Sequence, residues 1–93
     1  MSGDDELARL RAAVDQVDAR LVELLHERAR LAQALGSWKR ARGLPALDPT
    51  REGVVVSRAG AAARPPLDRA PLERVFAAIL AESRRVVQAA HGP

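Results

Sequence analysis

The first forty residues carry a nearly continuous apolar seam whose members lie three or four positions apart. This spacing is typical of one face of a long helix that packs against other helices. Gly43 followed by Pro45 is a typical helix stop, so the pattern predicts a helix from about residue 5 to about residue 42. The seam consists of Leu7, Leu10, Val14, Val17, Leu21, Leu24, Leu31, Leu35 and Trp38.

Two further helices are predicted after this stop. Asp48 suits an N-cap and Pro49 the first helical position, which predicts a helix over about 49–62. The run 54–56, three valines, also suits a strand, but no second strand is visible to pair with it, so a helix is preferred. After the linker 64–66, an apolar stripe predicts a third helix over about 68–90. That stripe is formed by Leu72, Val75, Phe76, Ile79, Leu80 and Val86.

The pattern therefore predicts an all-α protein with a single domain over 1–93. At 1.5 Å per residue, the first helix would be on the order of 55 Å long, too long for a compact chain of this size. A short chain also buries only a small core of its own. We therefore expect a homodimer in which a second protomer packs along the first helix.

Composition narrows the class of protein. The chain has no cysteine, which excludes disulfides and thiolate chemistry. A net charge of +3, interleaved acidic and basic residues and an aromatic content of 2% argue against nucleic-acid binding. No apolar run approaches the roughly 18 residues of a membrane span, and the acidic start does not resemble a secretory signal. A cytoplasmic protein is expected.

Arg28 interrupts the apolar seam at a position where a leucine would fit the pattern. A guanidinium stays charged and is costly to bury alone, so either a protein carboxylate pairs with it or it binds an anionic ligand. Lys39 follows three turns later on about the same face, about 16 Å away, and the two side chains can converge on one small anion. Arg11 lies about 25 Å from Arg28 and is turned by about 100°. It can reach that anion only from the partner of an antiparallel dimer; taken alone, Arg11 and Lys39 also suit solvated positions.

A second polar cluster, Asp48, Arg51 and Glu52, lies at the start of the second helix. Capping explains Asp48 fully, but a cation such as Arg51 is unfavourable in the first turn. The free amides of this turn also suit an anion or a hydroxyl. Ser83 lies on the inner stripe of the third helix, where small-residue packing and ligand contact both remain open.

Several kinds of chemistry lack support in the sequence. His26 and His91 have no partners at metal-ligand spacing, so no metal site is predicted. Neither a nucleophile with an adjacent base nor a glycine-rich phosphate loop is present. An enzyme of this sequence would work by placing charges and would need no cofactor.

With these residues in view, the chain resembles the all-helical chorismate mutases, the AroQ class, over about residues 7–88. The resemblance rests on the order and spacing of six charged residues, namely Arg11, Arg28, Lys39, Asp48, Arg51 and Glu52. It implies an intertwined homodimer of three-helix chains. It also implies the Claisen rearrangement of chorismate to prephenate, the branch step toward phenylalanine and tyrosine, without a cofactor.

The same resemblance implies a role for each residue of the site. Arg28 and the Arg11 of the other protomer would hold the two substrate carboxylates. Lys39 would reach a carboxylate and the ether oxygen, and Glu52 would accept a hydrogen bond from the ring hydroxyl. The end of the pocket near this hydroxyl would be shaped by Asp48, Arg51 and Ser83.

One position departs from the family pattern. The family usually has a glutamine four residues after the serine, but that position is Val87 here, and Gln88 comes one residue later. In an undistorted helix, we expect Gln88 to point away from the pocket. Three alternatives follow: a local bulge restores Gln88, Val87 lines the site and leaves Lys39 alone on the ether oxygen, or the substrate is isochorismate or aminodeoxychorismate. The second is preferred.

Two functions outside this enzyme class also remain open. The chain can be a weakly active domain that needs a partner enzyme of the aromatic pathway, as some short members of the family do. It can also be a simple helical dimerisation module.

Overall fold

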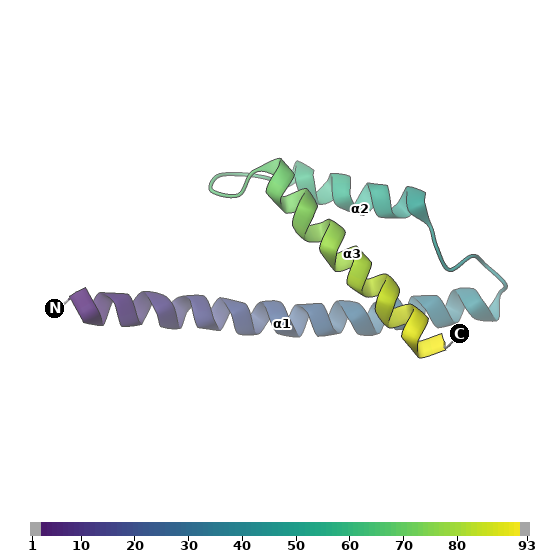
Figure 1. Ribbon diagram of the computed structural model, residues 1–93, viewed down its shortest axis with the longest axis horizontal. Coiled ribbons are helices and arrows are strands. Elements are labelled where there is room, and N and C mark those ends of the chain that lie inside the picture. Colours follow the sequence, from purple (N-terminus) through teal and green to yellow (C-terminus); the bar gives the residue numbers. More distant parts are fainter. Residues whose placement is uncertain (1–2, 92–93) are drawn as a thin grey trace.

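The described part of the chain forms three helices and belongs to the all-α class, as predicted (Figure 1). The computed structural model describes residues 3–91. Helix α1 spans Gly3–Ala41, α2 spans Pro49–Ala61 and α3 spans Arg69–His91, so each bound lies within two residues of the predicted one. The three valines of 54–56 lie inside α2, which decides between strand and helix in favour of the helix.

Helix α1 ends in a Schellman motif built on Gly43. Gly43 has a positive φ of 66°, its amide donates to the carbonyl of Arg40 at 3.2 Å, and the amide of Leu44 donates to the carbonyl of Lys39 at 2.9 Å. A residue with a Cβ atom is strained in this conformation, which explains the glycine. The motif confirms the predicted stop and fixes Lys39 in the last turn of α1.

Helix α2 begins at a side-chain cap, also as predicted. The Oδ1 atom of Asp48 accepts a hydrogen bond from the amide of Arg51 at 3.0 Å, and Pro49 occupies the first turn. The amide of Glu52 donates to the backbone carbonyl of Asp48 at 3.0 Å. The cap thus satisfies first-turn amides and places Glu52 in the first turn of α2.

Helix α3 joins the other two helices. A tight turn, in which Arg64 and Leu67 exchange backbone hydrogen bonds, reverses the chain after α2. The buried Gly60, near the end of α2, lets the start of α3 approach closely, because a Cβ atom on Gly60 would lie 2.8 Å from Nη1 of Arg69. From this end α3 runs back across α1 and packs against both other helices, whereas α1 and α2 make no direct helix packing within the described residues (Figure 1).

The N-terminal half of α1 extends beyond the other helices (Figure 1). The molecule is 62 Å long, and Leu80 is the one hydrophobic residue that counts as buried among residues 3–90. The apolar seam of α1 is exposed along this half and beyond it; Val14 retains 58% of its accessible surface, and Leu24, just past the middle of the helix, retains 60%. A contiguous apolar surface of this extent is unusual for a monomer and is typical of an interface.

Candidate active site

A cavity of about 320 Å³ lies where the second half of α1, the linker before α2, the start of α2 and the second half of α3 come together. Its apolar wall is formed chiefly by leucine and valine side chains. Its polar side chains come from all three helices and from the cap of α2. The polar lining residues are Arg28, Lys39, Asp48, Arg51, Glu52, Ser83, Arg84 and Gln88; the larger apolar ones are Leu31, Leu35, Leu47, Val55, Leu80 and Val87.

The predicted site residues therefore line one cavity, with a single exception. Arg11 is exposed on the N-terminal half of α1 and does not border the cavity within this chain. Its distance from Arg28, about 25 Å along a straight helix, accounts for this separation. The cations of α1 and the polar cluster at the start of α2 are distant in sequence. They meet because α3 packs against both helices and brings α2 toward the C-terminal half of α1.

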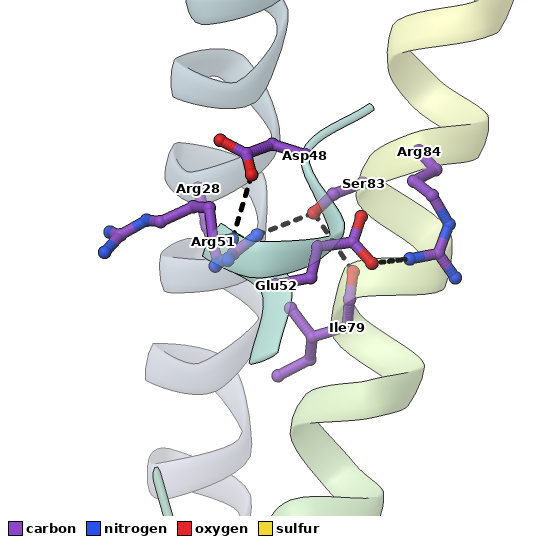
Figure 2. Close-up of polar contacts among 7 residues, drawn as sticks. All are labelled: Arg28, Asp48, Arg51, Glu52, Ile79, Ser83 and Arg84. Atoms are coloured by element: carbon purple, nitrogen blue, oxygen red, sulfur yellow. Dashed lines mark hydrogen bonds and ion pairs between the residues drawn. The ribbon is translucent and has the colours of Figure 1, made fainter. Parts of the chain in front are cut away.

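Arg28 is half-buried and is held by a hydroxyl group rather than by a carboxylate. Its Nη1 atom donates to Oγ of Ser83 at 2.6 Å, and Ser83 in turn donates to the backbone carbonyl of Ile79 at 3.0 Å (Figure 2). No ion pair joins Arg28 to a carboxylate among residues 3–91. Two kinds of partner were considered for Arg28, a protein carboxylate and an anionic ligand. No carboxylate of the described chain pairs with it, so the charge of Arg28 is available to an anionic ligand.

Glu52 is paired with Arg84, a residue that the sequence analysis missed. The Nη1 atom of Arg84 donates to Oε1 of Glu52 at 2.5 Å, and the two side chains retain 39% and 30% of their accessible surface (Figure 2). The spacing of α3 contained a signal for Arg84. The residues of α3 that line the cavity occupy one helix face with steps of three and four, namely Leu80, Ser83, Arg84, Val87 and Gln88.

The expectation that Gln88 points away from the pocket was wrong. Helix α3 is α-helical from residue 69 to residue 91, without a bulge, yet both Val87 and Gln88 line the cavity. A helix face that borders a cavity is at least about 100° wide, so two consecutive residues can both lie on it. Val87 is half-buried, whereas Gln88 is exposed at the rim.

The cavity carries an excess of positive charge. Four cationic side chains, Arg28, Lys39, Arg51 and Arg84, face two carboxylates, Asp48 and Glu52, which leaves two positive charges. Apolar walls weaken the screening of these charges and strengthen their attraction for an anion. The arrangement suits a small dianion.

The described residues contain no group of three or more histidine, cysteine, aspartate or glutamate side chains that could hold a metal ion. None of the helices formed by these residues is long and apolar enough to cross a lipid bilayer. The cavity can bind an anion, hold it in one conformation and stabilise negative charge.

The chain is similar to known proteins in sequence and in fold. The model of the family described as "Chorismate mutase type II" matches residues 10–88. A bifunctional chorismate mutase/prephenate dehydratase of Stutzerimonas stutzeri is 34% identical over 85 residues; the match covers 86% of this chain and 23% of that protein. The chain thus spans less than a quarter of this relative's length.

Two further proteins match over most of their own length. A 4-amino-4-deoxychorismate mutase of Streptomyces venezuelae is 33% identical over 87 residues, which cover 92% of this chain and 84% of that protein. The solved structure of a chorismate mutase from Thermus thermophilus superimposes with a TM-score of 0.81 at 32% sequence identity. That superposition covers 84% of this chain and 98% of the other.

Proposed function

This chain belongs to the type II chorismate mutase family, and we propose that it catalyses the intramolecular Claisen rearrangement of chorismate to prephenate. The observation that carries the proposal is Arg28, a half-buried cation without a carboxylate partner in the described chain, on a cavity with two excess positive charges. Chorismate is a dicarboxylate, so its charge complements that of the cavity. The assigned activity is that of an isomerase that needs no cofactor.

Substrate binding uses the cations on α1. Arg28 and Lys39 hold carboxylates of the substrate, and the serine that bonds Arg28 restricts the guanidinium to one orientation. The leucine and valine walls enclose the ring and keep the flexible enolpyruvyl arm folded over it. Fixing this conformation removes much of the entropic part of the barrier to a unimolecular reaction.

The chemical step requires stabilisation of charge rather than a nucleophile. As the carbon–oxygen bond of the ether breaks, negative charge grows on the ether oxygen. Lys39, which lines the cavity and is half-buried, stabilises that charge more strongly in the transition state than in the bound substrate. Val87 contributes to the wall of the same cavity, and Gln88 at its rim is a candidate for a second donor.

The other end of the substrate lies at the start of α2. Glu52 accepts a hydrogen bond from the ring hydroxyl. Asp48 acts through the cap that it makes with the amide of Arg51, which holds this turn in place. Arg51, a cation that lines the same cavity, adds to the positive potential there.

We further propose that the active unit is a homodimer. The exposed seam along the N-terminal half of α1 is the surface that a second copy would cover, and burying it would supply the core that the single chain lacks. An antiparallel arrangement carries Arg11 of each protomer toward the cavity of the other.

A partner enzyme of the aromatic pathway that raises the activity remains part of this proposal, and relatives that are bifunctional proteins support such a coupling.

A second candidate function is the rearrangement of 4-amino-4-deoxychorismate. The relative from Streptomyces venezuelae, named for that substrate, matches over 84% of its own length. The cations that bind carboxylates would serve both compounds. The two functions differ in the group that meets Glu52, a hydroxyl or an amine.

The proposed activity is tested by supplying chorismate to the purified protein and identifying the product. We expect the chorismate absorbance to disappear and prephenate to accumulate without added metal or cofactor. A protein that leaves chorismate unchanged, alone and with the partner enzyme added, contradicts the proposal. Thermal stabilisation by chorismate distinguishes a binding protein from a simple dimerisation module, since a ligand stabilises the state that binds it.

Ser83→Ala is expected to lower kcat/KM for chorismate by about tenfold, because a hydrogen bond to a charged group contributes about 1.5–3 kcal/mol. The loss should appear mainly in KM, since the hydroxyl orients Arg28 for binding. Ser57→Ala is the matched control, because Ser57 is exposed on α2 and does not line the cavity. Equal kinetics for the two variants would show that Ser83 only fills space.

A further inference from the structure

Arg84 is the one charged residue among the α3 residues that line the cavity, and it lies between two apolar ones. Leu80, one turn earlier on the same face, is 8% exposed, and Val87, three residues later, is half-buried. A hydrophobic side chain at position 84 would join these two residues in one apolar row. The guanidinium instead reaches across to α2 and pairs with Glu52 (Figure 2).

The pair divides the cavity into two regions of different charge. Among residues 3–91, no ion pair compensates Arg28 or Lys39, so the α1 side of the cavity is cationic. Glu52 is different, because Arg84 compensates its charge through Oε1. No hydrogen bond to Oε2 of Glu52 is made within the described chain, so this oxygen can still accept one from a ligand.

We propose that Arg84, through its ion pair with Glu52, makes the cavity select substrates that present a neutral hydroxyl to Glu52 over substrates that present an ammonium group. A hydroxyl donates one hydrogen bond to Oε2 and requires no opposite charge. An aliphatic amine is protonated at neutral pH, so it requires an uncompensated carboxylate and brings a second cation close to the guanidinium. This inference rests on the proposed function and assigns the specificity of that site.

The simpler alternative is that the pair only braces α2 against α3. If the ion pair only holds α2 against α3, its loss loosens the whole cavity and weakens the binding of both substrates alike. Both kcat/KM values then fall and their ratio stays unchanged. Loss of a specificity-determining charge changes the ratio. The ratio of kcat/KM for chorismate to kcat/KM for 4-amino-4-deoxychorismate therefore separates the two roles.

The experiment measures this ratio for the wild-type chain and three variants. We expect the wild type to prefer chorismate and Arg84→Leu to shift the ratio at least about tenfold toward the amino compound, as removal of one nearby like charge should. Arg84→Lys keeps the cation and should retain most of the preference. Arg85→Leu is the matched control, because Arg85 is exposed and pairs with Glu82 at 2.8 Å on the outer side of α3.

An unchanged ratio in Arg84→Leu overturns the inference, as does a wild type that prefers the amino compound. A wild type that converts neither compound contradicts the proposed function instead. The ratio of the two dissociation constants, measured by calorimetry on the same four proteins, then decides the role of Arg84. A shift of that ratio in Arg84→Leu alone supports the inference, and equal ratios in all four proteins reject it.

Discussion

Lys39→Ala is expected to lower kcat for the rearrangement of chorismate by at least about 10²–10³, the usual cost of removing a preorganised donor at a developing negative charge. Lys39 lines the cavity in the last turn of α1, where the Schellman motif at Gly43 fixes the backbone. Alanine leaves the helix intact and removes the ammonium group together with its aliphatic chain. Because Lys39 also binds a carboxylate, KM should rise as well.

Arg40→Ala is the control for this prediction, since Arg40 is exposed on the same turn and does not line the cavity. The measurement is the initial rate of chorismate loss at saturating substrate, with circular dichroism melts to verify folding. Gln88→Leu should cost less than Lys39→Ala, because Gln88 lies exposed at the rim. Near wild-type turnover by Lys39→Ala would exclude Lys39 as the group that stabilises the ether oxygen.

Arg11→Ala is expected to lower kcat/KM by about 10², although Arg11 lies far from the cavity of its own chain. The physical reason is the proposed antiparallel dimer, in which this guanidinium completes the site of the other protomer. Removing one member of an enclosed charge pair leaves a substrate carboxylate without its partner. The exposed, solvated position of Arg11 in the single chain predicts no loss at all, so the two expectations differ sharply.

Complementation tests the dimer directly. Arg11→Ala and Lys39→Ala should each be nearly inactive, yet the two chains refolded together should recover about a quarter of wild-type activity, because half of the dimers that form at random are mixed and each has one intact site. Sedimentation should give the mass of two chains. A mixture that remains inactive while it sediments as a dimer would show that Arg11 does not act across the interface.

The sequence was informative where the interactions are local. The Gly43 stop, the Asp48 cap and the step of the apolar residues each depend on groups within a few positions of one another. These features are enough to predict three helices and their approximate bounds. The spacing of Arg28 and Lys39 also predicted a shared face, since both lie on one continuous helix.

The sequence was less informative where helices meet. Arg84 and Glu52 are 32 positions apart, and nothing in their local sequence indicates that their side chains touch. The position of Gln88 was predicted wrongly because one ideal direction was assigned to each residue, whereas the cavity borders a wide face of α3. How many residues of a helix line a cavity depends on how closely the neighbouring helices approach that helix.

The sequence by itself thus determined the helices, their ends and the set of charged residues that could serve a dianionic substrate. Tertiary structure alone decided which of these charges are compensated. It left Arg28 with a serine hydroxyl and gave Glu52 a guanidinium. The reason is that capping and periodicity arise within a few residues, while an ion pair between helices depends on their crossing and axial rotation, which packing of the whole chain sets.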